Sequence, residues 1–298
     1  MNIYIHMQAA VDIVHQSPHP KNKIAATIAK DDWNFSCVNH WPAAIENTIG
    51  REPDIGNSSG TIHAETACIF EAMRQGNATK NASIFITDPP CPNCMKNMAE
   101  AGISKLYIDH KGFDKDWAKR RGMSFENMSM RIADKAGIDV FEIYRKEERY
   151  EIISKHASNY KPAIENPPII NDQIDFNDCD NMPFASARAN DLNGEALSIL
   201  VSSHPTVGFT TEDIEKQRGK YSFIIQPLNR LLIIAAKEGL SLDPTSLISS
   251  RNPTSRELVN FIGAGFNTLK ILDLNTSRDE FGPIALKHLQ EHNLLMLS

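Results

Sequence analysis

One part of this 298-residue chain is written twice, 163 positions apart. Residues 226–239 (QPLNRLLIIAAKEG) lie without a gap on residues 63–76 (HAETACIFEAMRQG), and residues 253–265 lie in the same way on residues 90–102. The matched identities are Pro90 with Pro253, Gly76 with Gly239, Asn97 with Asn260, and Leu106 with Leu269. Shared helical periodicity does not hold one offset through two helices and the strand after them, so the repeat predicts two domains of one fold.

Strands and helices alternate in the first half, which is typical of an α/β domain with much of its sheet parallel. We expect a second domain of the same kind after a change of texture near residue 146. The sequence from 146 to 192 is rich in Asn, Asp and Pro and has little periodicity, which is typical of a linker or a wrapping segment. The predicted domains are therefore 1–145 and 193–298, joined by residues 146–192. The expected elements of the first domain are strands near 24–32, 34–38, 82–87, 105–110 and 138–144, helices near 3–14, 63–76, 91–102 and 114–137, and a loop over 43–62.

Composition excludes several classes of protein. No apolar run approaches 18 residues, so the sequence predicts no membrane span. Five scattered cysteines and an N-terminus unlike a signal peptide indicate a reducing compartment, so we expect a cytoplasmic protein. The net charge of −6 argues against nucleic acid as a partner, because a nucleic-acid footprint normally needs a basic face.

A group of chemically active residues stands at the start of two consecutive helices. His63 and Glu65 open one helix, and Cys91 and Cys94 open the next after an intervening strand. Two cysteines one helical turn apart can face one metal ion, His63 can add a nitrogen ligand, and the fourth position of Zn²⁺ stays open for water. Glu65 would lie beside the ion without ligating it, as a proton carrier must. A thioredoxin-like redox pair is the alternative interpretation of the two cysteines.

The HAE and PCPNC motifs together resemble those of the zinc-dependent cytidine and deoxycytidylate deaminase superfamily. The resemblance covers roughly residues 1–145 and extends to the order of the elements. It implies two cytidine-deaminase-like α-β-α sandwich domains with mixed, mostly parallel sheets flanked by helices. It also implies Zn²⁺ held by His63, Cys91 and Cys94, with Glu65 as the catalytic proton carrier in hydrolytic deamination.

The resemblance also suggests where a substrate would lie. Residues 39–42 (Asn-His-Trp-Pro) stand where deoxycytidylate-type enzymes carry Asn-Gly-x-Pro, so Asn39 becomes a candidate substrate contact. The side chains of His40 and Trp41 depart from the small residues of that motif, and Trp41 could stack on a base or cover the core. The remaining candidates are Ala64 and Pro90, which flank the metal motifs, and, after the fourth strand, His110 and Lys111.

The second copy lacks the metal motif. His63 meets Gln226, Cys91 meets Thr254 and Cys94 meets Glu257, so residues 193–298 are expected to form a degenerate deaminase domain without zinc. We expect this domain either to close the substrate cleft, as a neighbouring subunit would, or only to stabilise the fold. Whether the chain also forms a homo-oligomer stays open.

The leading hypothesis is a deaminase of a small cytosine nucleotide or nucleoside. A deaminase of guanine or tRNA adenosine and a non-catalytic zinc-binding regulatory subunit are the alternatives. The intact Glu65 argues against the regulatory subunit, because a structural zinc site has no use for a proton carrier.

Overall fold

The computed structural model describes residues 2–51, 55–115, 128–179, 181–213 and 222–298. Part of the helix expected over 114–137 lies outside the described residues, and its last turns form α7. The elements of the first half are α1 (Ile3–Ile13), β1 (Ala25–Lys30), β2 (Trp33–Val38), α2 (Ala43–Thr48), α3 (Ala64–Arg74), β3 (Ser83–Ile86), α4 (Pro92–Glu100), β4 (Lys105–Asp109), α5 (His110–Phe113), α7 (Met130–Ala136), β5 (Asp139–Tyr144) and β6 (Arg149–Ser154).

The first sheet has six strands in the order β2-β1-β3-β4-β5-β6. Its central strands β3, β4 and β5 are parallel, and the remaining neighbours are antiparallel. A helix crossover joins β3 to β4, which parallel pairing requires, whereas the short β1–β2 turn can make only a hairpin. The α/β class and the mixed sheet are confirmed, with a smaller parallel share than we expected.

The second half builds a sheet of seven strands that contains the path β15-β14-β13-β8-β9-β7. Here too a parallel group, β13, β14 and β15, adjoins antiparallel strands. The elements are β7 (Ile169–Asn171), β8 (Phe184–Asn190), β9 (Ala196–Ser202), β10 (His204–Pro205), β11 (Ile224–Ile225), α8 (Pro227–Glu238), β12 (Ser241–Leu242), β13 (Ile248–Asn252), α9 (Ser255–Gly263), β14 (Thr268–Ser277), α10 (Phe281–Glu291) and β15 (Met296–Leu297).

The two halves repeat in structure as they do in sequence. Helices α8 and α9 begin at Pro227 and Ser255, each 163 residues after the first residue of its counterpart, Ala64 of α3 and Pro92 of α4. The strand order β2-β1-β3-β4 corresponds to β9-β8-β13-β14, with the same parallel and antiparallel senses. The second sheet therefore belongs to a second deaminase-like body.

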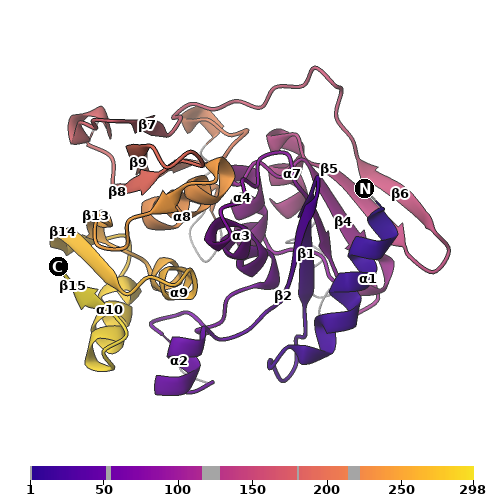
Figure 1. The fold of residues 1–298 in the computed structure, drawn as a ribbon, viewed down its shortest axis with the longest axis horizontal. Helices are drawn as coiled ribbons and strands as arrows, with labels where there is room; N and C mark the ends of the chain where they lie inside the picture. Colours follow the sequence, from indigo (N-terminus) through magenta and orange to yellow (C-terminus); the bar gives the residue numbers. More distant parts are fainter. Residues whose placement is uncertain (1, 52–54, 116–127, 180, 214–221) are drawn as a thin grey trace.

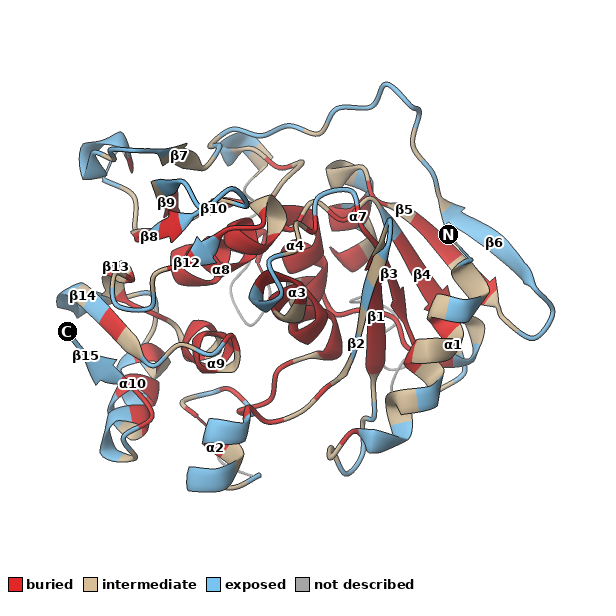
Figure 2. Cartoon of the chain, in the orientation of Figure 1, coloured by how far each residue is buried: buried red, intermediate tan, exposed pale blue. Residues whose placement is uncertain are grey.

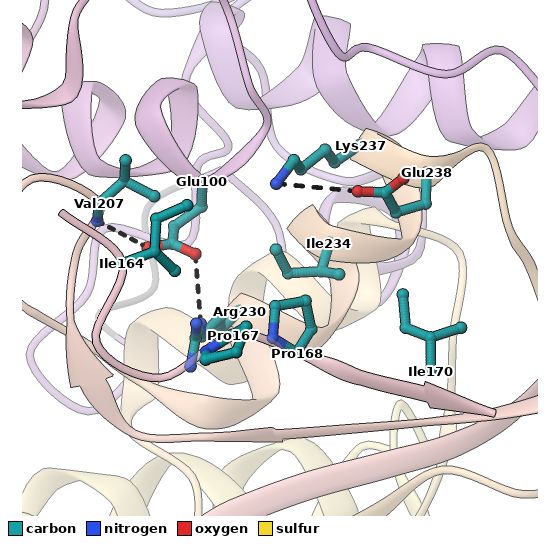
Figure 3. Close-up of a pocket in the computed structure, with 10 residues that line it drawn as sticks. All are labelled: Glu100, Ile164, Pro167, Pro168, Ile170, Val207, Arg230, Ile234, Lys237 and Glu238. Carbon is teal, nitrogen blue, oxygen red and sulfur yellow. Dashed lines mark hydrogen bonds and ion pairs between the residues drawn. The ribbon is translucent and has the colours of Figure 1, made fainter. Parts of the chain in front are cut away.

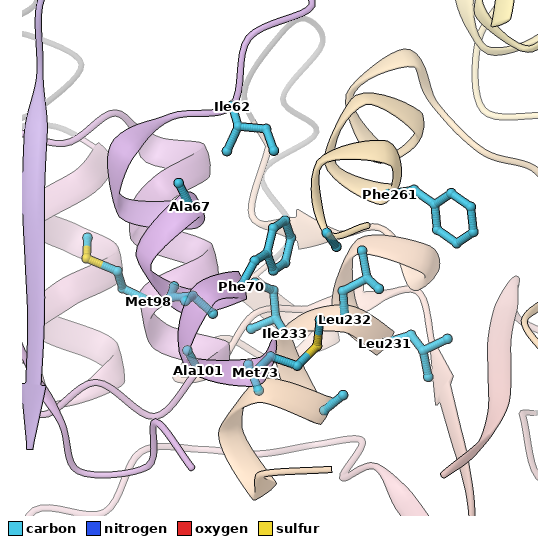
Figure 4. Close-up of a cluster of buried hydrophobic side chains, with 14 of the residues drawn as sticks. Ile62, Ala67, Phe70, Met73, Met98, Ala101, Leu231, Leu232, Ile233 and Phe261 are labelled. Carbon is cyan, nitrogen blue, oxygen red and sulfur yellow. The ribbon is translucent and has the colours of Figure 1, made fainter. Parts of the chain in front are cut away.

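The four repeated helices pack together between the two sheets (Figure 1). Figure 4 shows the apolar core that they share, in which Phe70 and Met73 of α3 lie among Leu232 and Ile233 of α8. Phe70, Leu232 and Ile233 are fully buried. Burial of side chains of this size stabilises a fold by roughly 1.5–3 kcal/mol each, so the two halves form one hydrophobic unit.

A buried row of polar side chains crosses this interface. The Asn97 amide donates to the Thr66 hydroxyl at 3.0 Å, Asn229 donates to Asn97 at 2.7 Å, and Asn260 donates to Asn229 at 2.7 Å. Asn229 and Asn260 are the repeat counterparts of Thr66 and Asn97. Because buried polar groups need partners, the row fixes how one helix pair sits on the other.

A buried ion pair adds a second link between the halves. The Glu100 carboxylate accepts from Arg230 Nε at 3.2 Å, from the Thr206 hydroxyl at 3.2 Å and from the Val207 amide at 3.0 Å. Figure 3 shows this pair at the wall of a pocket of about 370 Å³. Since the two charges are nearly inaccessible to water, each depends on the other for compensation.

The segment 146–192, expected to be a linker or a wrapping segment, contains three strands that the sequence did not predict. Strand β6 extends the first sheet, and β7 and β8 belong to the second sheet. Residues 155–168 run between them as a mostly exposed strap (Figure 2). The reason is tertiary: β8 pairs with β9 and β13, and these neighbours outweigh the weak strand propensity of its alanines. None of the helices in the described part of the chain is long and apolar enough to cross a membrane.

Candidate metal and catalytic site

Two helix N-termini bring the metal motifs together. His63 is the N-cap of α3, and Cys91 is the N-cap of α4, with Pro92 in the first turn. Proline favours this position because its missing N–H has no helical partner there. In the chain, α3 follows β2 and α4 follows β3. Both strands pair antiparallel with β1 and so run in the same direction, and the two helices therefore start at the same end of the sheet.

The three predicted ligands converge. His63 Nδ1 lies 3.2 Å from Cys94 Sγ and 3.6 Å from Cys91 Sγ, and the two sulfurs are 3.5 Å apart. A tetrahedral zinc site places two thiolate sulfurs roughly 3.8 Å apart, and a sulfur and an imidazole nitrogen roughly 3.5 Å apart, as follows from the usual bond lengths. The donor set and its spacing therefore fit a zinc ion.

The surroundings favour a thiolate at Cys91. The Cys94 thiol beside it, and then the ring of His63, hold the pKa of Cys91 well below its usual range. A helix N-terminus adds to this effect, because the partial positive charge of the amides favours an anion. Thiolate is the form in which cysteine binds a metal.

Glu65 lies beside the triad in the first turn of α3 and is almost completely buried. Its Oε2 atom has no hydrogen-bond partner within the described structure. Burial raises the pKa of this carboxyl, and the nearby His63 partly opposes that rise. A buried carboxyl with a raised pKa and a free oxygen is suited to accept and return protons near neutral pH.

The candidate substrate residues differ in what they already bind. Asn39 is buried, and its Oδ1 accepts from the Ser17 hydroxyl at 2.7 Å and from the Ile24 amide at 2.9 Å. Its Nδ2 donates to the Asn22 carbonyl at 2.8 Å, which leaves one hydrogen of the amide for another acceptor. The hydrogen bonds of Asn39 therefore stabilise the loop that precedes β1.

Trp41 is buried, and its ring lies parallel to that of His19, with centroids 5.7 Å apart. Its indole Nε1 has no hydrogen-bond partner among the described residues, although a buried indole N–H normally finds one. Burial, and then the nearby His63, lower the pKa of His19. Sequence reasoning missed His19, which stands in a turn without any motif.

The remaining candidates are buried or already have partners within the chain. Ala64 and Pro90 are buried, and the Pro90 carbonyl accepts from the Ser129 hydroxyl at 3.0 Å. His40 Nδ1 lies 2.8 Å from the Val38 carbonyl. His110 stacks on Tyr144 and lies 3.2 Å from Asp109, and the Lys111 amide also bonds Asp109, so their described contacts do not run toward the zinc ligands.

A buried acid that sequence reasoning missed precedes the cysteine motif. Asp88 forms a 2.6 Å ion pair with Lys115 and accepts from the Thr87 hydroxyl at 2.7 Å. Burial raises the pKa of Asp88 to about 6 in spite of that lysine. The available signal was its position, an acid directly after a buried strand and just before Cys91.

At the corresponding place in the second domain a carboxylate joins the helix starts. Glu257 Oε1 accepts from the Leu228 amide at 2.9 Å, and Oε2 accepts from the Thr254 amide and hydroxyl at 2.8 Å each. Gln226, the counterpart of His63, binds Arg251 at 2.9 Å. A capping box thus bridges α8 and α9 where the first domain presents metal ligands.

The fold and the site define an α/β domain in which three candidate metal ligands converge beside a buried carboxyl. Residues 2–110 match the family model of the cytidine and deoxycytidylate deaminase zinc-binding region. They therefore form a deaminase zinc-binding domain of this family, which confirms the resemblance drawn from the motifs.

Several known proteins are similar to parts of this chain. The chain is 34% identical over 90 residues to the deoxycytidylate deaminase of Enterobacteria phage T4, covering 30% of this chain and 42% of that enzyme. It is 42% identical over 50 residues to the phage T2 enzyme, covering 17% and 27%. The chain thus spans less than half the length of these two relatives. A dCMP deaminase from cyanophage S-TIM5, solved with dCMP and dUMP, aligns over 47% of this chain and 94% of that one, with 19% identity and a TM-score of 0.35.

Proposed function

We propose that the protein is a hydrolytic zinc-dependent deaminase that converts the amino group of a small cytosine nucleotide or nucleoside into a carbonyl and releases ammonia. The observation that carries the proposal is Glu65, a buried carboxyl with an unpaired oxygen beside three converging metal ligands. A site that served only to hold a metal would leave this desolvated acid without a purpose, and its burial costs free energy.

His63, Cys91 and Cys94 would hold the zinc ion. When bound, the ion supplies Lewis acidity, which lowers the pKa of water toward about 7. Three protein ligands are the number found in catalytic rather than structural zinc sites.

Glu65 would carry both protons of the reaction. Its carboxylate accepts one proton from the attacking water and delivers it to the ring nitrogen beside the amino-bearing carbon. It then takes the second proton from the new hydroxyl group and passes it to the amino group, so that the C–N bond breaks and ammonia leaves while the C–O bond becomes a carbonyl. The raised pKa of Glu65 suits a group that must both gain and lose a proton.

Trp41 and Asn39 would orient the base. The Trp41 Nε1–H and the second N–H of the Asn39 amide are hydrogen-bond donors without an acceptor among the described residues. The ring carbonyl of a pyrimidine would be a suitable acceptor. Similarity to two phage deoxycytidylate deaminases supports cytosine as the base. The His40-Trp41 pair departs from the family motif at this very place, so the base is the part of the proposal that most needs a direct test.

The test is ammonia release by the zinc-loaded protein on dCMP, CMP, deoxycytidine, cytidine, cytosine, guanine, adenosine and tRNA. We expect turnover of a cytosine compound and its loss in Glu65→Gln. Glu151→Gln, an exposed acid on β6, is the control and should retain activity. Turnover of guanine or tRNA alone would replace the substrate class, and no turnover with zinc bound would favour a regulatory subunit.

A further inference from the structure

The segment that leads into His63 is fixed from one side by the proposed substrate residues. Ile62 and His40 exchange backbone hydrogen bonds of 2.8 and 3.1 Å, in an isolated bridge. Residue 62 is therefore tied to the stretch 39–41 and precedes the ligand His63 directly in the chain. A displacement of Ile62 would therefore act on both.

Helix α9 of the second domain fixes the same segment from the other side. Arg256 Nη1 donates to the Thr61 carbonyl at 2.5 Å. Gly263 lies so close to Ile62 that a Cβ atom there would overlap Ile62 Cδ1 and would reach within 3.3 Å of Pro42 Cγ. Arg74 of α3 completes the contact by donating to the Gly263 carbonyl at 3.1 Å.

The contact is reciprocal between the repeats. Thr61 corresponds to Ile224 in the second copy, and the Ile224 carbonyl accepts from Lys96 of α4 at 3.0 Å. In each domain, one cationic side chain therefore donates to a backbone carbonyl just before a helix of the other domain: Arg256 before α3, and Lys96 before α8. We call the contact from Arg256 the brace. Only the approach at Thr61 leads to metal ligands, so only the brace from α9 has a chemical consequence.

We propose that Arg256 and Gly263 of the degenerate domain are positioning residues for the metal and catalytic site, acting through Thr61 and Ile62 on His63 and on the stretch 39–41. The catalytic part of this inference rests on the proposed function, and its effect on metal binding does not. The second domain thereby supplies part of the scaffold of the site as well as general stability.

The first test replaces Arg256 by Met, which keeps the length of the side chain and removes the donor. We expect zinc to bind roughly tenfold more weakly in competition with a chromogenic chelator, because the loss of the charge-assisted hydrogen bond to Thr61 leaves His63 less firmly positioned. The absorption bands of the cobalt(II)-substituted protein should shift and KM should rise. Arg256→Lys should recover part of each change, and Arg188→Met, which removes an exposed arginine paired with Asp243, should leave all of them unchanged.

The second test uses the close contact of Gly263. Gly263→Ala should change zinc affinity and the cobalt spectrum in the same direction, because the new methyl group displaces Ile62. Ile62→Val deletes the overlapping Cδ1 atom, so the double variant should recover part of the loss. If Arg256→Met fails to fold, Gly263→Ala and its double variant with Ile62→Val test the positioning role instead.

The two ideas fail in different ways. Folded Arg256→Met and Gly263→Ala proteins with unchanged zinc affinity and cobalt spectra would overturn the positioning role. Wild-type protein that is inactive on every substrate would sink the proposed function, and the metal readouts would still test the brace.

Discussion

The Glu257 carboxylate accepts a hydrogen bond from the Leu228 amide at 2.9 Å, across the gap between α9 and α8. These residues are the repeat counterparts of Cys94 and Glu65. In the first domain this gap is flanked by sulfur and imidazole ligands, and in the second a capping carboxylate closes it with backbone partners. The starts of α3 and α4, which carry the candidate metal ligands, have no side-chain cap, whereas Thr254 and Glu257 cap the start of α9.

This relationship predicts that the second domain can regain a metal. Gln226→His, Thr254→Cys and Glu257→Cys together restore the ligand types at helix starts that coincide with those of the first domain. We expect two zinc ions per chain instead of one by elemental analysis of folded protein. The triple variant with Thr254→Ser in place of Cys is the control. A folded Cys variant that still holds one zinc would show that the helix geometry of the two sites differs.

Metal removal should weaken the fold as well as the activity. Zinc would join the starts of α3 and α4, and a ligand present at a thousand times its dissociation constant stabilises the folded state by about 4 kcal/mol. Chelation should therefore lower the thermal midpoint of the wild type by several degrees, and added zinc should restore it. Cys91→Ser should lose that response to zinc, and Cys37→Ser, on β2, should keep it. An unchanged wild-type midpoint after verified removal of zinc would contradict this expectation.

The Glu100–Arg230 ion pair should stabilise the packing of the two halves against each other. Glu100→Ala leaves a buried guanidinium without its counter-charge, which typically costs about 3–5 kcal/mol. Chemical denaturation should show this loss, while Glu100→Ala/Arg230→Met should lose less than the sum of the two single changes. Strict additivity of the single changes would show that the pair does not act as a unit.

Asp88 should make stability depend on pH with a defined sign. Burial raises its pKa from 3.8 to about 6, so the folded chain retains a proton that the unfolded chain releases between these values. The contribution of Asp88 to the free energy of unfolding is fully present below about pH 4. It is lost as the pH rises through 6, and the total loss is up to about 3 kcal/mol. Asp88→Asn should thus gain stability relative to wild type as the pH rises from 4 to 7.

Thermal unfolding of both proteins across this range measures the difference. Asp243→Asn is the control, because hydrogen bonds from Thr245 hold the pKa of Asp243 below its usual range and its sign is opposite. A constant difference between Asp88→Asn and wild type at all pH values would contradict the raised pKa.

Trp41 should bind substrate through its indole N–H. Trp41→Phe keeps an aromatic ring and removes the unpaired donor, so the loss is that of one hydrogen bond, about 1 kcal/mol. We expect KM for the best substrate to rise severalfold with a smaller change in kcat. Trp33→Phe, in a ring stack with Phe35 on β2, is the matched control. Equal KM values for both variants would assign Trp41 to the core.

The sequence by itself determined the elements whose cause is local. Apolar spacing and terminal glycines predicted α3, α4, α8 and α9, and one constant offset predicted the second deaminase-like sheet. The convergence of His63, Cys91 and Cys94 was predictable because each occupies a fixed place at or next to a helix start. Strand β8 was not predicted, because it has no local cause and forms by pairing with β9 and β13.

The tertiary structure alone decided which distant residues act together. No motif marks His19 as the neighbour of Trp41 or Asp88 as a buried acid, because both properties come from burial among residues far away in the chain. The brace from Arg256 to Thr61 spans 195 positions and exists only because two helix pairs pack face to face. Local patterns fix helices and their ends, whereas burial and long-range contacts depend on how those helices pack, and packing sets the geometry of the site.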